Sequence, residues 1–160
     1  MSPKAAAAVA HGAGVYGMVA GQSMDLLNEN NPDMSMALLN AINQRKTGAM
    51  LMASVEAGAY CAAEKPQCLE ALHEFGVQYG YLFQLTDDIL DVIGDAAQVG
   101  KTLGKDKEAG KITAVTLLGL DGAMQYAREL AQKARQPLEI YGEKARFFFE
   151  LLDYTVTRKS

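Results

Sequence analysis

Apolar residues recur along most of the chain at the three- to four-residue spacing of amphipathic α-helices. No stretch shows the two-residue alternation of a half-buried strand. The pattern therefore predicts an all-α fold, and 160 residues suit one helical domain, expected to extend over residues 1–160. The expected helices cover residues 3–28, 36–62 and 67–91, then a stretch from 113 to a break at 137, and finally 138–158.

Turn-forming and helix-breaking residues set these limits. The sequence Asn-Asn-Pro-Asp at 30–33 predicts a turn, and Asp33 or Ser35 is expected to cap the helix that follows. The fourth helical stretch should be interrupted near Gly119, and Pro137 should break or restart the helix.

Three carboxylates interrupt the apolar helix that runs through residues 83–91. Asp87 and Asp91 are one turn apart on one face, Asp88 is rotated by one residue, and Gln84 lies on the same edge. Clustered anions on an apolar helix resist desolvation, so they should protonate or find a cation. Magnesium fits, because it takes one or two carboxylates and completes its shell with water and phosphate oxygens. An ordinary solvated acidic helix end explains this stretch equally well when it is taken alone.

A basic, glycine-rich stretch follows at residues 100–111, with three glycines and four lysines. Glycines let the backbone approach a ligand, and lysines supply positive charge for phosphate. The stretch is not a Walker A loop, because its spacing differs and Ile112 stands where Ser or Thr is needed. The acids also lack the alternating ligands of a calcium-binding EF-hand. An acidic helix before a basic loop suits a metal-bridged diphosphate, although a solvated linker is the commoner interpretation of such a loop alone.

The segments FQLTDDILDVIGD (83–95) and GKTLGKDKEAGKIT (100–113) resemble the second aspartate-rich motif and basic loop of the trans-isoprenyl diphosphate synthases, the farnesyl/geranylgeranyl diphosphate synthase family. GQSMDL (21–26) and KTGA (46–49) agree, in the family's order. The resemblance runs from about Ala8 to Lys159. It covers only the C-terminal half of the family's isoprenoid synthase helical bundle.

The resemblance implies a role for each matching residue. The implied cofactor is Mg²⁺, held by Asp87, Asp88 and Asp91 with support from Asp25. The implied substrate contacts are Lys46, Thr47, Gln84, Lys101, Lys111 and Gln22, and the implied catalytic set is Asp87, Asp88, Lys46 and Lys101. Without the family, ordinary helix polar groups would be the preferred interpretation of Lys46, Thr47, Gln22 and Asp25. Ala114 stands where family members usually carry Tyr, which is a minor departure.

The activity implied is a prenyltransferase of isoprenoid biosynthesis, which condenses isopentenyl diphosphate with an allylic diphosphate through magnesium-assisted ionisation. The first aspartate-rich motif and its Arg-Arg pair have no match here, so the isolated chain is expected to be inactive: a truncated synthase, a half that meets its complement, or a degenerate relative. The alternative is a non-catalytic helical subunit of a full-length synthase. A class I terpene cyclase is disfavoured, because its Asn/Ser/Glu-type metal motif is not found.

Composition limits the partners. The formal charge of −4 gives no basic excess for nucleic acid, and no apolar stretch reaches membrane-spanning length. No complete secretory signal is recognisable, so a cytoplasmic location is expected, with Cys61 and Cys68 as reduced thiols. The apolar run at 147–149 predicts a surface that meets a partner, and we expect a homodimer or a complementing N-terminal half.

Overall fold

The computed structural model of the chain describes residues 2–99 and 113–158, with residues 95–99 described by their backbone alone. Within these ranges the chain is almost entirely helical and contains no strand, which confirms the all-α prediction. The elements are α1 (Pro3–Ala13), α2 (Met18–Leu27), α3 (Met36–Asn43), the π-helical turn η1 (Gln44–Gly48), α4 (Ala49–Cys61), α5 (Pro66–Val99), α7 (Ala114–Arg135), the 3₁₀ segment η2 (Gln136–Ala145) and α8 (Arg146–Thr157).

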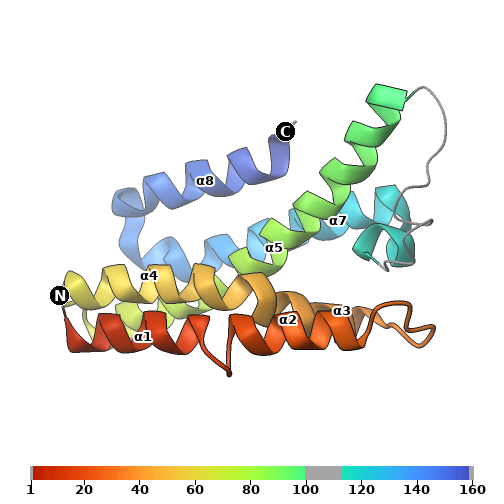
Figure 1. Cartoon of the computed structure of the whole chain (residues 1–160). Helices are drawn as coiled ribbons and strands as arrows, with labels where there is room; N and C mark the ends of the chain where they lie inside the picture. Colours follow the sequence, from red (N-terminus) through yellow and green to blue (C-terminus); the bar gives the residue numbers. More distant parts are fainter. Residues whose placement is uncertain (1, 100–112, 159–160) are drawn as a thin grey trace.

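The long helix α5 is the axis around which the others pack. It contacts α4 and η1 on one side and α7 and α8 on the other, while α1 lies along the outer face of α4 (Figure 1). Apolar residues of α5 recur every three or four positions and supply much of the buried core, as expected for a helix covered on more than one face. These residues are Leu72, Phe75, Tyr79, Leu82, Leu85 and Ile89.

Residues 3–28 form two helices, where the sequence predicts one. α1 ends at Ala13, and the N–H of Gly14 bonds the carbonyl oxygens of Ala10 and His11. The chain then makes a tight turn before α2, in which a Cβ built on Gly17 would lie 2.0 Å from the carbonyl oxygen of Gly12. Only glycine permits this approach, so the glycines that favour close helix packing also break the helix here.

Residues 36–61 are continuously helical, as predicted, but they include a π-helical turn. Ser35 is the cap, and its Oγ accepts a hydrogen bond from the N–H of Leu38 at 3.3 Å. The turn η1 interrupts the α-helical hydrogen-bond pattern and carries Lys46 and Thr47. Such single-turn insertions are frequent at functional sites.

α5 continues to Val99, beyond its predicted end at 91, whereas the limits of α7 follow the predicted breaks. Thr113 caps α7 with a reciprocal capping box to Thr116, and the interruption falls at Gly119, whose φ is 72°. α7 ends just before Pro137. The last helix starts later than predicted, at Arg146, because η2 intervenes and Gly142 has a positive φ of 53°.

The last helix lies along α5. Phe148 meets Phe75 edge to face at 4.9 Å between ring centroids, and Tyr79 shares a 3.4 Å hydrogen bond with Thr155. Phe147, in contrast, is 67% exposed. Between α4, α5 and α8 an apolar groove of about 530 Å³ remains open. In the part of the chain that is described, no helix combines the length and apolarity needed to cross a membrane.

Candidate diphosphate and metal site

Glycines allow the backbone of η1 to pack closely against two other helices. A Cβ on Gly21 of α2 would lie 2.1 Å from the backbone nitrogen of Lys46, and one on Gly80 of α5 would lie 2.7 Å from the Cα of Gly48. Backbone atoms cannot yield as a flexible side chain can, so these contacts require glycine. The three close-packed backbones place Lys46 and Thr47 between α2 and α5.

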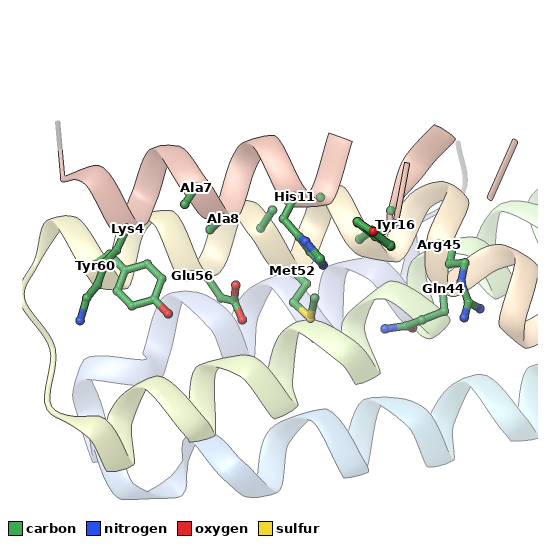
Figure 2. Close-up of a pocket in the computed structure, with 14 residues that line it drawn as sticks. Lys4, Ala7, Ala8, His11, Tyr16, Gln44, Arg45, Met52, Glu56 and Tyr60 are labelled. Atoms are coloured by element: carbon green, nitrogen blue, oxygen red, sulfur yellow. The ribbon is translucent and has the colours of Figure 1, made fainter. Parts of the chain in front are cut away.

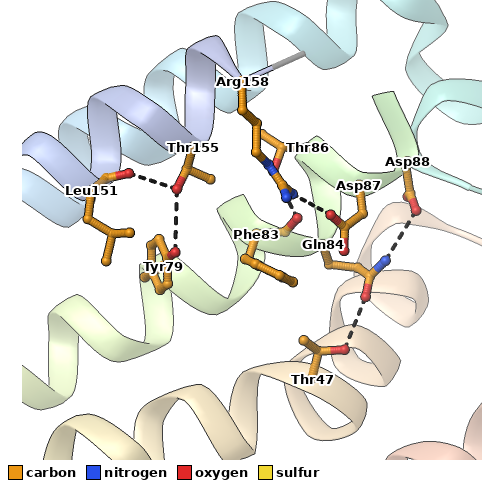
Figure 3. Close-up of polar contacts among 10 residues, drawn as sticks. All are labelled: Thr47, Tyr79, Phe83, Gln84, Thr86, Asp87, Asp88, Leu151, Thr155 and Arg158. Atoms are coloured by element: carbon orange, nitrogen blue, oxygen red, sulfur yellow. Dashed lines mark hydrogen bonds and ion pairs between the residues drawn. The ribbon is translucent and has the colours of Figure 1, made fainter. Parts of the chain in front are cut away.

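A hydrogen-bond chain runs from η1 through α5 to the start of α7. Thr47 Oγ1 donates to Gln84 Oε1 at 3.1 Å, and Gln84 Nε2 donates to Asp88 Oδ1 at 3.3 Å (Figure 3). The other oxygen of Asp88 accepts the N–H of Ala114, the first residue of α7, at 3.2 Å. Asp88 is only 6% exposed. Its carboxylate therefore ties three segments that are distant in sequence.

Asp87 points to a different neighbour. Its carboxylate forms an ion pair with Arg158, which follows α8, and the guanidinium also donates to Thr86 Oγ1 at 3.3 Å (Figure 3). The same guanidinium lies 5.0 Å from the centre of the Phe83 ring. Arg158 is absent from the residue set predicted from the sequence. The sequence shows a basic residue at the end of the last amphipathic helix, but its pattern does not indicate which acidic residue this arginine contacts.

The predicted residues Lys46 and Asp25 pair with each other. Lys46 Nζ lies 2.5 Å from Asp25 Oδ2, and both side chains are about one-third exposed or less. Gln22, beside Gly21 on α2, is exposed. The structure thus brings α2 and η1 together, with the lysine and aspartate neutralising one another. Lys101 and Lys111 lie outside the described residues.

The carboxylates divide into two kinds when tested against magnesium. Asp91 is exposed and one turn beyond Asp87, so these two offer oxygen donors on neighbouring turns of α5. Both oxygens of Asp88 already accept hydrogen bonds. Over residues 2–94 and 113–158, no three acidic, His or Cys side chains converge into a metal-holding group. Magnesium needs only one or two protein carboxylates, so Asp87 and Asp91 fit it, with water and phosphate as the remaining ligands.

A separate groove of about 640 Å³ runs between α1 and α4 (Figure 2). Polar side chains line it beside small residues, among them Lys4, His11, Tyr16, Arg45, Glu56 and Tyr60. Among the described residues predicted for the diphosphate site, none lines this groove. The candidate diphosphate and metal site therefore lies with η1 and α5, and it borders this groove only through Gln44 and Arg45 of η1.

The chain's similarity to known proteins decides its family. The family model described as polyprenyl synthetase matches residues 5–147. The chain belongs to the polyprenyl synthetase family. This confirms the resemblance first seen in four short motifs.

Individual relatives agree with this family. A farnesyl diphosphate synthase of Haemophilus influenzae is 39% identical over 156 residues, which are 95% of this chain and 52% of the relative. A dimethylallyltranstransferase of Fischerella ambigua is 38% identical over 150 residues, 94% of this chain and 43% of the relative. The chain spans about half the length of the curated relatives it matches.

Solved structures show the same fold. A polyprenyl synthase from Caulobacter crescentus, complexed with calcium and isoprenyl diphosphate, superposes with a TM-score of 0.87 at 27% identity, over 99% of this chain and 60% of that one. A geranyltransferase from Helicobacter pylori, complexed with magnesium and isoprenyl diphosphate, gives 0.75 at 28% identity, over 95% and 50%. The helical arrangement of this chain is therefore that of the corresponding part of prenyl synthases.

The structural role of Asp88 in this chain can be tested by mutation, with the exposed Asp91 as a control. Asp88→Ala should destabilise the fold by about 2–3 kcal/mol, because Gln84 and the N–H of Ala114 lose a buried acceptor. For a chain of this size that lowers the melting temperature by roughly 4–12 °C. Thermal unfolding without metal measures this. Asp91→Ala, which removes an exposed carboxylate one turn away, is the control and should change stability by no more than about 0.5 kcal/mol. Equal effects of the two substitutions would show that Asp88 does not tie α5 to α7.

Proposed function

We propose that this chain supplies one wall of a trans-prenyltransferase site, where an allylic diphosphate condenses with isopentenyl diphosphate. The observation that carries the proposal is the 3.1 Å contact between Thr47 and Gln84. It joins the KTGA segment to the aspartate-rich segment within a fold shared with prenyl synthases. Asp88 accepts a hydrogen bond from the same Gln84, and Lys46 adjoins Thr47 in sequence, so one location combines a cation, hydroxyl and amide groups, and a carboxylate.

The character of α5 changes along its length in a way that suits an amphipathic substrate. Phe75, Tyr79, Phe83, Asp87 and Asp91 follow one another at intervals of one turn, with ring centroids 5.5 Å and 6.2 Å apart along the aromatic part. The first two of these residues line the apolar groove of about 530 Å³. Phe75 and Tyr79 are themselves buried, at 1% and 8% exposure, so a hydrocarbon chain would lie in the groove beside them, while the carboxylates further along α5 would take a metal-bound diphosphate.

The residues of this chain act by positioning and by charge. When bound, magnesium supplies Lewis acidity that stabilises the leaving diphosphate. Asp87 and Asp91 would hold the ion. Lys46 would leave its partner Asp25 and add positive charge beside the diphosphate. Asp88 keeps Gln84 and the start of α7 in place. Metal and isoprenyl diphosphate in the crystal structure of the Helicobacter pylori geranyltransferase support this assignment.

The opposing wall would come from outside these 160 residues. Because the chain spans about half of its relatives, we propose that alone it binds diphosphate weakly and does not hold the leaving group from both sides. Association with a second copy or with a complementing N-terminal half remains a prediction. The competing function is a non-catalytic subunit that modulates a complete synthase.

Product formation separates these functions. The purified chain, incubated with isopentenyl diphosphate, an allylic diphosphate and magnesium, should form no detectable condensation product. The same assay repeated with a complete farnesyl diphosphate synthase should show an unchanged rate. A changed rate without turnover by the chain alone favours the non-catalytic subunit. Rapid product formation by the lone chain would contradict the half-site proposal.

A further inference from the structure

Helix α8 runs alongside the part of α5 that leads to the acidic residues. The two helices run in the same direction along this contact: Phe148 packs on Phe75, and further along Thr155 contacts Tyr79. The contacts end where Arg158 reaches Asp87. The position of this guanidinium is therefore set by the docking of a whole helix.

We propose that Arg158 is the resident counter-ion of Asp87, and that a divalent cation takes this carboxylate only by displacing Arg158 from it. The inference rests on the proposed function, since it concerns the same carboxylate. It adds a residue that controls metal affinity from a different helix, and it links occupation of the site to the docking of the end of α8.

Burial makes the pair strong enough to compete. The Arg158 side chain is 16% exposed and that of Asp87 38%, so solvent screens the pair less than it screens a fully exposed one. The Thr86 hydroxyl and the Phe83 ring hold the guanidinium in place on two further sides. A cation that binds Asp87 must overcome this attraction, which lowers its apparent affinity.

The pair also contains a feature that eases its release. Arg158 Nε is buried and has no hydrogen-bond partner among the residues that the structure describes. An unsatisfied buried donor costs free energy, and hydration after displacement would recover it. The docked guanidinium is therefore held, but not by a fully satisfied set of contacts. An exchangeable counter-ion requires this intermediate strength.

The coupling acts in both directions. If Arg158 weakens the binding of a cation to Asp87, then the cation must weaken the docking of Arg158 by the same factor. Metal binding should consequently loosen the last turn of α8, where the N–H of Arg158 bonds the carbonyl oxygen of Tyr154. This predicts a change at a site that no proposed ligand touches.

Manganese binding, followed by electron paramagnetic resonance with Mn²⁺ in place of Mg²⁺, tests the first direction. Arg158→Gln should bind Mn²⁺ about three- to tenfold more tightly than the wild-type chain, as expected for loss of a partly screened, charge-assisted contact. Arg158→Lys, which keeps the charge, should stay within about twofold of wild type. The control is Arg128→Gln. The exposed Arg128 lines the same small cavity as Arg158, and its substitution removes an equal charge. It should leave the affinity within about twofold.

Amide hydrogen exchange tests the second direction. Added Mg²⁺ should speed exchange at residues 155–158 in the wild type, while Arg158→Gln should exchange fast with or without the ion. Equal Mn²⁺ affinity in all four proteins would overturn the role of Arg158 and leave the proposed function intact. If both Arg158→Gln and Arg128→Gln bound Mn²⁺ more tightly, the gain would come from the change in net charge, and the specific role of Arg158 would be overturned too. If none of the proteins binds Mn²⁺, the proposed metal site itself fails, and this inference fails with it.

Discussion

Pyrophosphate titrated into the chain should give a binding isotherm with magnesium present and none after the metal is chelated. Asp87 and Asp91 carry negative charge and repel phosphate unless a cation lies between them. Arg158 offsets Asp87 alone, and Lys46 is already paired with Asp25 at 2.5 Å, so neither cation is free to offset the phosphate. Isothermal titration calorimetry with magnesium, and again with a chelator, measures the difference.

Two substitutions extend this prediction. Asp87→Ala should weaken magnesium-dependent binding by about 1.5–3 kcal/mol, the range for a contact to a charged group. Lys101→Ala should have a similar effect, which is expected from the family resemblance because Lys101 lies outside the described residues. Asp153→Ala is the matched control, since this exposed carboxylate on α8 pairs with Arg135 at 2.6 Å. It should leave the affinity unchanged. Equal pyrophosphate affinity in magnesium and in chelator would contradict the metal-bridged site.

Gly21→Ala should both destabilise the chain and weaken its binding of diphosphate. The new Cβ would meet the Lys46 backbone nitrogen at 2.1 Å and the Lys46 Cα at 2.4 Å, so α2 and η1 must move apart. Overpacking of this kind costs about 1–3 kcal/mol, and here the clash is with backbone. We expect the melting temperature to fall by roughly 4–8 °C for a loss of about 2 kcal/mol. Thermal unfolding and the same calorimetric titration measure the two effects.

The control for this substitution is Gly58→Ala on α4. A Cβ at Gly58 meets no atom within 4 Å, and the residue is exposed. Alanine is the better helix former by up to about 1 kcal/mol, so this variant should be unchanged or slightly more stable. If Gly21→Ala were as stable as Gly58→Ala, the close approach of α2 to η1 would not hold the site together.

The sequence was sufficient for those parts of the fold that depend on local chemistry. Ser35 and Thr113 cap helices where their hydroxyls can accept a backbone N–H, and Pro137 ends a helix because it lacks one. The break after Ala13 was missed because Gly14 and Gly17 fit a helix as well as a turn. Their role depends on contacts between backbones, which local spacing does not encode.

The same distinction applies to the site. Helical geometry alone indicates that Asp87 and Asp88 point in directions about 100° apart, but not which of them is buried. That outcome depends on α7, whose first N–H meets Asp88, and on Arg158, which meets Asp87. Both partners lie far along the chain. Pattern analysis therefore found the carboxylates but could not assign each one its neighbour.

Asp87 is synthesised before Arg158, so the contact between them can form only after a delay. Arg158 follows Asp87 by 71 positions. At about 5–20 residues per second, a ribosome needs roughly 4–14 s to make that stretch. If Arg158 competes with the metal as proposed, cellular magnesium can meet the Asp87 carboxylate during this interval, before its intramolecular competitor has been made. The newly made chain would then bind the ion more tightly than the mature one.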